Sequence, residues 1–231
     1  MKVFTLSICL AVALSCSSAR AGLVISEVVY NEPGSDTAGE WIELFNNGPA
    51  AIDLSDYKIG DEETMNPPSA ENGGMWKFPA GATIPAGGVQ IVAVSGALFT
   101  TNYGFAPTYE VVETSAAIPN LSNYTAWASN PSPVINMSNS NDQAVLLDGS
   151  DQIVDAVSWG NTFAFNPGLA DAEADGQSYE RVNGYVDTNT AADWRLGNPS
   201  SPGSVAVPEA STATLLLGLL VVASIRRRAQ G

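Results

Sequence analysis

Short alternating runs of apolar and polar residues, separated by turn-forming residues, cover most of this chain. The clearest is EWIELFNNGPAAIDLSDYKIGD, from Glu40 to Asp61. Its first residues alternate between two faces, with Trp41, Glu43 and Phe45 on one and Glu40, Ile42 and Leu44 on the other. A period of two residues is that of a β-strand. Asn46–Pro49 and Ser55–Asp56 interrupt the pattern with residues that favour turns, so the stretch predicts three antiparallel strands.

Similar strand-like segments recur along the chain. They are Leu23–Tyr30, Trp76–Phe78, Val89–Val94, Val134–Leu147, Ile153–Gly160, Gln177–Val182 and a closing segment that ends at Trp194. Asp148–Asp151 contains an Asp-Gly turn and predicts a hairpin. Glu62–Met75 predicts a polar loop, and Leu98–Pro133 a long irregular loop with at most one strand, near Tyr109–Val112. No segment has helical periodicity over a useful length, so we predict an all-β fold, an antiparallel sandwich or barrel in one domain.

The first 21 residues have the layout of a secretory signal peptide. Lys2 precedes an apolar stretch from Val3 to Leu14, and Ala19-Arg20-Ala21 supplies small residues for cleavage before Gly22. The alternatives are a buried first helix or strand, and a lipoprotein signal that ends at Cys16. We therefore predict an exported protein whose folded domain spans residues 22–197.

Composition narrows the chemistry that this domain can perform. The chain has no histidine, which excludes Ser-His-Asp and Cys-His nucleophilic sites and His-based zinc sites. Both cysteines, Cys9 and Cys16, lie in the predicted signal peptide, so the exported domain would hold no disulfide. Residues 22–207 contain four basic and 23 acidic residues, a net charge of −19. A surface of that sign repels phosphate backbones, so we expect no nucleic-acid partner.

The carboxyl end contains a second targeting pattern. The Pro/Ser/Gly-rich residues 198–206 predict a linker, and residues 207–231 predict a sorting tail. In this tail, Val207-Pro208-Glu209-Ala210 precedes the apolar run Thr212–Ile225, and Arg226–Arg228 follow it. The apolar run predicts a transmembrane helix, with the arginines on the cytoplasmic side. A final apolar strand of the sandwich is the alternative interpretation.

Four segments resemble the lamin tail domain family. They are ISEVVYN (Ile25–Asn31), the stretch Glu40–Asp61, FPAGATIPAGG (Phe78–Gly88) and SNSNDQAVLLDGSDQIVDAVSWG (Ser138–Gly160). Tyr179–Val182 resembles the family's late strand, and all five follow the family's order. The resemblance implies an immunoglobulin-like antiparallel β-sandwich without catalytic residues. Glu62–Met75 and Leu98–Pro133 depart from the family's pattern as insertions.

The carboxyl end is similar to PEP-CTERM sorting signals, in which a short Pro-Glu-Pro motif precedes an apolar helix and a basic end. Here Pro208 and Glu209 match the motif, and Ala210 replaces its second proline. This resemblance implies a membrane-anchored precursor that an exosortase-type enzyme processes.

Carboxylates are the only acid–base groups available for catalysis. Glu27, Glu40 and Glu43 lie in or beside predicted strands and could form a glycosidase-like pair. We favour outward strand positions or hydrogen bonds at strand ends for them, because the family resemblance implies no catalytic role. Asp171, Glu173 and Asp175 alternate before Gly176 like the front of a calcium loop, but Val182 stands where an EF-hand needs glutamate. A looser calcium site there stays an alternative to a solvated acidic loop.

Tryptophans are the remaining candidates for ligand binding, because they can stack on sugars. Trp41 and Trp159 fall in strand patterns and are expected in the core. Trp127, in the irregular loop, is the best candidate for an exposed ring.

Together these features predict an exported, non-catalytic structural or adhesive module of the cell surface or extracellular matrix, with no cofactor. Its expected partners are the membrane, through its tail, an exosortase-type enzyme, and an envelope polysaccharide or protein. The alternative is a carbohydrate- or calcium-binding extracellular module.

Overall fold

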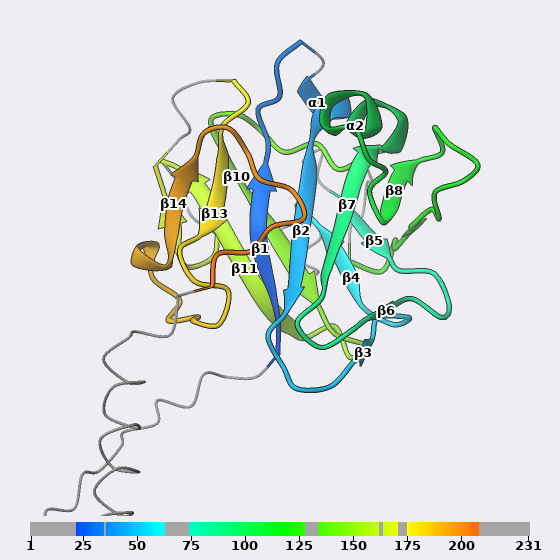
Figure 1. The fold of residues 1–231 in the computed structure, drawn as a ribbon. Helices are drawn as coiled ribbons and strands as arrows, with labels where there is room; N and C mark the ends of the chain where they lie inside the picture. The colour runs from blue at the N-terminus through cyan, green and yellow to red at the C-terminus, as the bar shows by residue number, and fades with distance from the viewer. Residues whose placement is uncertain are drawn as a thin grey trace, which may run out of the picture.

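Two packed β-sheets form the fold, as the alternating pattern predicts (Figure 1). The computed structural model describes residues 22–34, 36–62, 74–127, 134–161, 164–170 and 175–207. Among these residues most of the regular structure is strand, and the helices are short. The predicted all-β sandwich is therefore confirmed.

The first layer, here called the β1 sheet, has six strands. In spatial order they are β14 (Trp194–Gly197), β13 (Ser178–Arg181), β1 (Leu23–Val29), β2 (Trp41–Asn46), β7 (Val89–Ser95) and β8 (Tyr109–Val112). Neighbouring strands are antiparallel except β7 and β8 at one edge, which are parallel. The central strand β2 pairs with β1 and β7 over nearly its whole length.

The second layer, here called the β10 sheet, also has six strands. In order they are β12 (Gly168–Leu169), β11 (Ile153–Gly160), β10 (Asn141–Leu147), β4 (Lys58–Gly60), β5 (Met75–Lys77) and β9 (Ser122–Asn123). The predicted hairpin is present, because β10 and β11 pair antiparallel across Asp148–Asp151. At its edge β12 lies parallel to β11. The expectation of a wholly antiparallel sandwich is thus corrected at one edge of each sheet, where the edge strand runs parallel to its neighbour.

Short elements close the ends of the sandwich (Figure 1). They are β3 (Ile52–Asp53) and β6 (Thr83–Ile84), which pair with each other, and the helices α1 (Asp36–Gly39) and α2 (Gly96–Tyr103). The 3₁₀ helix η1 (Ala191–Asp193) leads into β14 at the edge of the β1 sheet. The helices α1 and α2 lie at the end of the sandwich opposite β3 and β6. We call these the helical end and the hairpin end.

Helix α2 begins at Gly96 and continues into the stretch Leu98–Pro133, for which the sequence predicts an irregular loop. The Ser95 side chain accepts a hydrogen bond from the Leu98 amide at its start, and Gly104, with φ +78°, ends it in the left-handed conformation. Its buried residues are Gly96 and Phe99 alone, so the helix has no apolar stripe that a periodicity test would find. The predicted strand at Tyr109–Val112 is confirmed as β8, but the limit of one strand in this stretch is wrong, because β9 (Ser122–Asn123) is a second.

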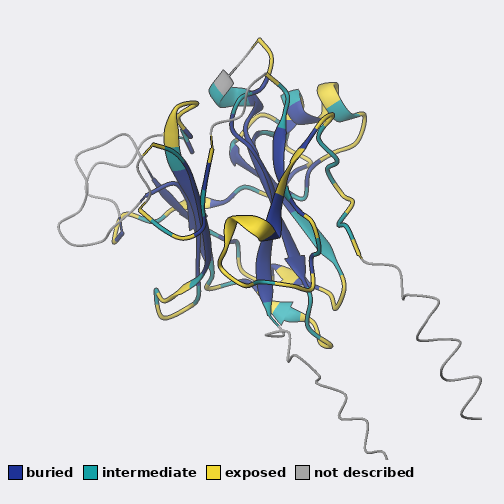
Figure 2. Ribbon diagram, turned by 90° about the vertical axis from the view of Figure 1, so that its left-hand side faces the viewer, coloured by how far each residue is buried: buried dark blue, intermediate teal, exposed yellow. Residues whose placement is uncertain are grey.

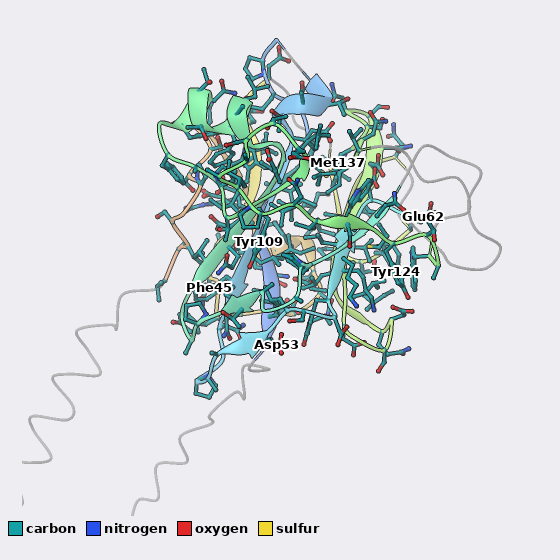
Figure 3. All side chains as sticks on the ribbon, turned by 90° about the vertical axis from the view of Figure 1, so that its right-hand side faces the viewer. Phe45, Asp53, Glu62, Tyr109, Tyr124 and Met137 are labelled. Carbon is teal, nitrogen blue, oxygen red and sulfur yellow. The ribbon has the colours of Figure 1, made fainter. Side chains whose placement is uncertain are left out.

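The main core lies between the sheets, and the buried strands form two dark layers in Figure 2. It contains apolar side chains from both sheets, among them Ile25, Ile42, Leu44, Leu146, Val157 and Trp159. Strand β2 is buried on both faces, because Trp41 on its outer face packs against Phe99 of α2, with ring centroids 5.8 Å apart. In Figure 3, Phe45 lies on the side of the β1 sheet and Tyr124 on the side of the β10 sheet.

Candidate functional site

A row of three glutamates crosses the outer face of the β1 sheet. Glu27 of β1 lies directly opposite Glu43 of β2 on one side and Glu180 of β13 on the other. Glu43 shares its face with Trp41 and Phe45, as the two-residue alternation predicts. Like charges directly opposite each other on neighbouring strands are destabilising, so this row needs compensating donors.

Those donors come from residues 198–207, which we call the C-terminal strap. The Ser201 amide donates to Glu27 Oε1 at 2.8 Å, and the Gly203 amide donates to Glu43 Oε2 at 2.6 Å. The Ser201 hydroxyl donates to Glu180 Oε2 at 2.8 Å. The strap crosses in front of β1 and β2, as the orange segment of Figure 1 shows. Residues 198–206 were expected to form a linker, but they are held on the sheet by these carboxylates.

Burial is the largest cause of the pKa shifts of two glutamates in this row, Glu43 and Glu27. It raises the pKa of Glu43 to about 7, although hydrogen bonds from the Ser26 hydroxyl and the Gly203 amide oppose the shift. It also raises the pKa of Glu27, against hydrogen bonds from Ser178 and Ser201. The pKa of Glu43 therefore lies near neutral, although the strap covers this side chain.

The structure corrects the expected placement of the three candidate glutamates. Glu27, Glu40 and Glu43 are all buried, with at most 1 % of their surface exposed. Glu40 faces the other side of its strand, where its Oε2 accepts the Met137 amide at 2.9 Å. Glu27 and Glu43 lie beneath the strap, so a glycosidic substrate would have to displace residues 198–206 to reach them. They form hydrogen bonds at the covered face of a strand and not at its exposed face.

The tryptophans offer no stacking platform to solvent. Trp41 and Trp159 are in the core as predicted, and Trp159 stacks on Tyr30 with ring centroids 4.2 Å apart. Trp127 was expected to be exposed but is 7 % exposed, because it packs against Met75 and Val145 on the outer face of the β10 sheet. Its indole N–H donates to the Glu62 carbonyl at 3.3 Å. Trp76 and Trp194 are buried as well.

The calcium and sorting candidates fall mostly outside the described residues. Asp171, Glu173, Pro208 and Glu209 are not described, and neither are the predicted signal peptide and transmembrane tail. Asp175 is described and exposed. Across the described part of the chain, no group of three or more acidic or cysteine side chains could hold a metal ion. Within the same residues, no helix is long and apolar enough to cross a membrane.

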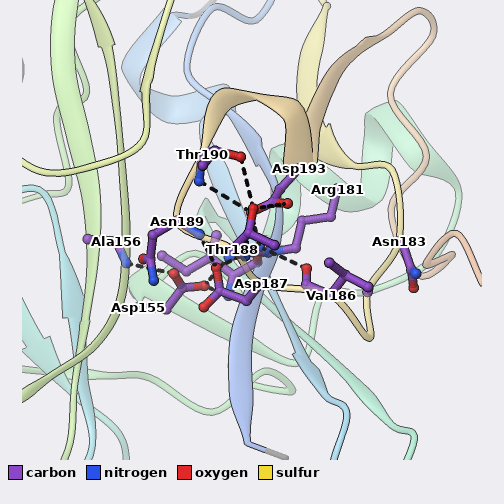
Figure 4. A network of polar contacts seen from close by, with 12 residues as sticks. Asp155, Ala156, Arg181, Asn183, Val186, Asp187, Thr188, Asn189, Thr190 and Asp193 are labelled. Carbon is purple, nitrogen blue, oxygen red and sulfur yellow. Dashed lines mark hydrogen bonds and ion pairs between the residues drawn. The ribbon is translucent and has the colours of Figure 1, made fainter. Parts of the chain in front are cut away.

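A second polar cluster, centred on Arg181, joins the two sheets (Figure 4). Arg181 Nη2 lies 2.7 Å from Asp155 Oδ2, and Nη1 lies 3.3 Å from Asp187 Oδ1. Arg181 Nε donates to the Ile25 carbonyl at 2.7 Å, and the guanidinium lies over the Trp194 ring. Sequence reasoning missed this cluster. The signal that could have found it is the single aspartate in the apolar run Ile153-Val154-Asp155-Ala156-Val157.

A pocket of about 400 Å³ opens at the hairpin end, between the first residues of β1 and the β10–β11 hairpin. The side chains that line it include Ile52, Tyr57, Asp148, Gln152, Ile153 and Asp187. This pocket could not be predicted from the sequence, because its walls come from four separate parts of the chain.

Both ends of the described body meet close to this pocket. The Gly22 amide donates to Asn47 Oδ1 at 2.6 Å, and the Asn47 side chain donates to the Gly184 carbonyl at 3.2 Å. The Gly184 amide in turn donates to the Ala206 carbonyl at 3.0 Å. Three consecutive hydrogen bonds therefore connect Gly22 to Ala206.

Comparisons with known proteins agree with this architecture. Residues 17–161 match the sequence profile of the Lamin Tail Domain family. Among solved structures, the chain is similar to a DUF4876 family protein from Bacteroides thetaiotaomicron, with a TM-score of 0.57 and 14 % sequence identity. That similarity covers 82 % of this chain and 75 % of the other, and it concerns the fold alone. A comparison with curated proteins finds no match.

Proposed function

The chain belongs to the lamin tail domain family, and on that premise we propose that it is an exported, non-catalytic module with a structural or adhesive role. It acts in this proposal at the cell surface or in the extracellular matrix, as an immunoglobulin-like sandwich. Residues 1–21 are its signal peptide, and residues 207–231 are its PEP-CTERM-like sorting tail. An exosortase-type enzyme recognises Pro208 and Glu209 and separates the tail from the body.

The observation that carries this proposal is the meeting of Gly22 and Ala206 at one end of the sandwich. Cleavage before Gly22 leaves an amino group that can still donate to Asn47. A tail that begins at Val207 leaves the body at the same end. While the precursor keeps both its signal peptide and its sorting tail, the hairpin end of the body faces the membrane. The helical end then points away from the membrane.

The covered positions of the candidate carboxylates Glu27 and Glu43 support a non-catalytic role. The chain contains no histidine, and the buried carboxylates Glu27 and Glu43 are held by the strap. The acidic body, with its net charge of −19, favours solubility and mutual repulsion between copies outside the cell.

The intact mass of the protein, measured separately in membrane and medium, tests the proposal. We expect a species that begins at Gly22 in both fractions, and a released species that ends near Pro208. A species that keeps Arg226–Arg228 in every fraction would contradict processing by an exosortase, and the tail would then be an anchor only. A species that keeps residues 1–21 would contradict export by a cleaved signal.

The second candidate function is a carbohydrate- or calcium-binding module. The pocket at the hairpin end favours carbohydrate, because it combines an aromatic ring, aliphatic side chains and polar groups. Calcium binding would rest on Asp171, Glu173 and Asp175. Titration of the protein with calcium, followed by calorimetry and by the melting temperature, tests calcium binding. A specific site raises the melting temperature as the calcium concentration increases.

A further inference from the structure

The pocket at the hairpin end has an apolar floor and a polar rim. Tyr57 and Ile52 are half-buried and pack against the main core, while Ile153 is 48 % exposed at the edge. Asp148 and Gln152 come from the β10–β11 hairpin, and Asp187 comes from the loop after β13. Its volume of about 400 Å³ lies in the range of small-molecule sites.

Three polar groups of this rim keep unused hydrogen-bonding capacity. Asp148 Oδ1 accepts the amides of Ser150 at 2.7 Å and Gln152 at 3.0 Å, which holds the hairpin turn. Within the described residues, its Oδ2 has no hydrogen-bond partner, and neither does the Tyr57 hydroxyl. Asp187 also uses only Oδ1, for the Arg181 guanidinium at 3.3 Å and the Asn189 amide at 3.2 Å.

The buried glutamates differ from this rim. Both oxygens of Glu43 accept hydrogen bonds, from the Ser26 hydroxyl at 2.7 Å and the Gly203 amide at 2.6 Å. Their protein partners therefore explain them without a ligand. The hydroxyl of Tyr57 and the outer oxygens of Asp148 and Asp187 remain for solvent or a bound molecule.

These groups select for a particular ligand chemistry. Carboxylates accept from hydroxyl donors, and an aromatic ring with aliphatic neighbours packs on a flat C–H surface. A sugar ring offers both, with hydroxyl groups around apolar faces. Among the described residues no basic side chain lines the pocket, and residues 22–207 have a net charge of −19, so an anionic sugar would be repelled.

We propose that this pocket binds an uncharged carbohydrate, with Tyr57 and Ile153 packing on the sugar and Asp148 and Asp187 accepting its hydroxyl groups. The inference rests on the second candidate function and gives it a location. A glycan bound there would lie beside Gly22 and the Ala206 end of the body. The module would then contact glycans at the end from which the sorting tail leaves.

Binding of defined trisaccharides to the full-length protein tests this site. The protein is purified as cells process it, in a detergent without a sugar headgroup, with its ends recorded by intact mass. Cellotriose, maltotriose and mannotriose are titrated by calorimetry and by saturation-transfer NMR, beside trigalacturonate and 1,5-diaminopentane. We expect at least one neutral trisaccharide to bind with a Kd of about 1 mM or lower, and trigalacturonate not to bind.

Two conservative variants separate binding from folding. Tyr57→Phe removes only the hydroxyl, and Asp148→Asn keeps the Oδ1 acceptor that holds the turn. Each should weaken trisaccharide binding by about 3- to 10-fold, the effect of one hydrogen bond, without changing the melting temperature by more than a few degrees. Ile153→Ala should also weaken binding. Leu196→Ala, which removes a similarly exposed side chain from β14, is the matched control and should leave binding unchanged.

Each contrary result overturns a distinct statement. If no neutral trisaccharide binds at 10 mM, both the proposed carbohydrate site in this pocket and the carbohydrate-binding function are wrong. If a trisaccharide binds wild type and both conservative variants equally, the function stands and this pocket is not its site. If 1,5-diaminopentane binds and the sugars do not, the pocket is a site for organic cations. The mass measurement of export and processing is independent of all three results.

Discussion

The carboxylate of Asp155 lies 2.7 Å from the guanidinium of Arg181, and neither side chain has any exposed surface. Asp155 belongs to β11 and Arg181 to β13, so this ion pair joins the two sheets. Asp155 Oδ2 also accepts the Ile25 amide at 2.7 Å. Burial raises the pKa of Asp155 to about 6, and the Arg181 guanidinium opposes the shift.

Removal of Arg181 should destabilise the sandwich strongly. Arg181→Met leaves Asp155 buried without its counter-charge, and breaking a buried pair in this way costs about 3 to 5 kcal/mol. We expect a decrease of that size in the free energy of unfolding, measured with urea. Arg195→Met is the matched control: Arg195 pairs with Glu180 at the surface, so the variant should lose less than about 1 kcal/mol. Equal losses in both variants would contradict a bridging role for Arg181.

Stability should depend on pH through Glu43. Its pKa is 4.5 in the unfolded chain and about 7 in the folded protein, so the folded state binds the proton more tightly. The stability associated with this proton is complete below pH 4.5 and is lost as the pH rises through 7. Glu43→Gln keeps an acceptor for the Gly203 amide and a donor for the Ser26 hydroxyl, and it has no charge to bury.

The Glu43→Gln variant should therefore be more stable than wild type at pH 8, by roughly 2 to 3 kcal/mol. This advantage should shrink towards pH 5, where wild-type Glu43 is protonated. Unfolding curves of both proteins between pH 5 and 8 measure it. Glu113→Gln, at an exposed glutamate, is the control and should show no such trend. A constant difference between wild type and Glu43→Gln across the range would refute the raised pKa.

The C-terminal strap should contribute to stability through Ser201. Its hydroxyl lies 2.8 Å from Glu180 Oε2 and 3.3 Å from Glu27 Oε2. Ser201→Ala removes this donor from two carboxylates and should cost about 1 to 2 kcal/mol. Limited proteolysis should also cut residues 198–207 faster in the variant. Ser204, an exposed serine three residues further along the strap, gives the control. For Ser204→Ala we expect wild-type stability and a wild-type rate of cleavage.

Trp127 should behave as a core residue of the β10 sheet. Because it is 7 % exposed against Met75 and Val145, Trp127→Ala should lower the free energy of unfolding by about 3 kcal/mol. Sugars that bind the protein should leave the fluorescence of Trp127 unchanged. Phe105→Ala, at a ring that is 43 % exposed, should cost less than about 1 kcal/mol. If Trp127→Ala is as stable as wild type, this indole is not part of the packed layer.

Much of the fold could be predicted because it depends on local patterns. The alternation in Glu40–Asp61 places Ile42 and Leu44 in the core and Trp41 on the opposite face, as observed. The Asp-Gly turn at Asp148–Asp151 specifies the β10–β11 hairpin. Helix α2 escaped prediction because only two of its residues are buried, so its sequence carries no helical period.

The functional surfaces could not be predicted in this way. An alternating pattern places Glu43 on the same strand face as Trp41 and Phe45, but it does not show that Gly203 returns to cover that face. Trp127 looks exposed in a polar, irregular stretch because burial depends on a β10 sheet made from distant residues. The pocket at the hairpin end likewise unites residues that lie far apart in the sequence, from Gly22 to Asp187.

The sequence by itself determined the strands, the faces of their side chains, the absence of histidine chemistry and the acidic charge, because these follow from residue identity and a two-residue period. Only the tertiary structure decided which face stays covered, where Arg181 meets Asp155, and that Gly22 and Ala206 lie at one end. Those outcomes depend on contacts between residues far apart in the chain. Local patterns constrain each strand separately and leave the pairing between distant segments to the packing of the whole domain.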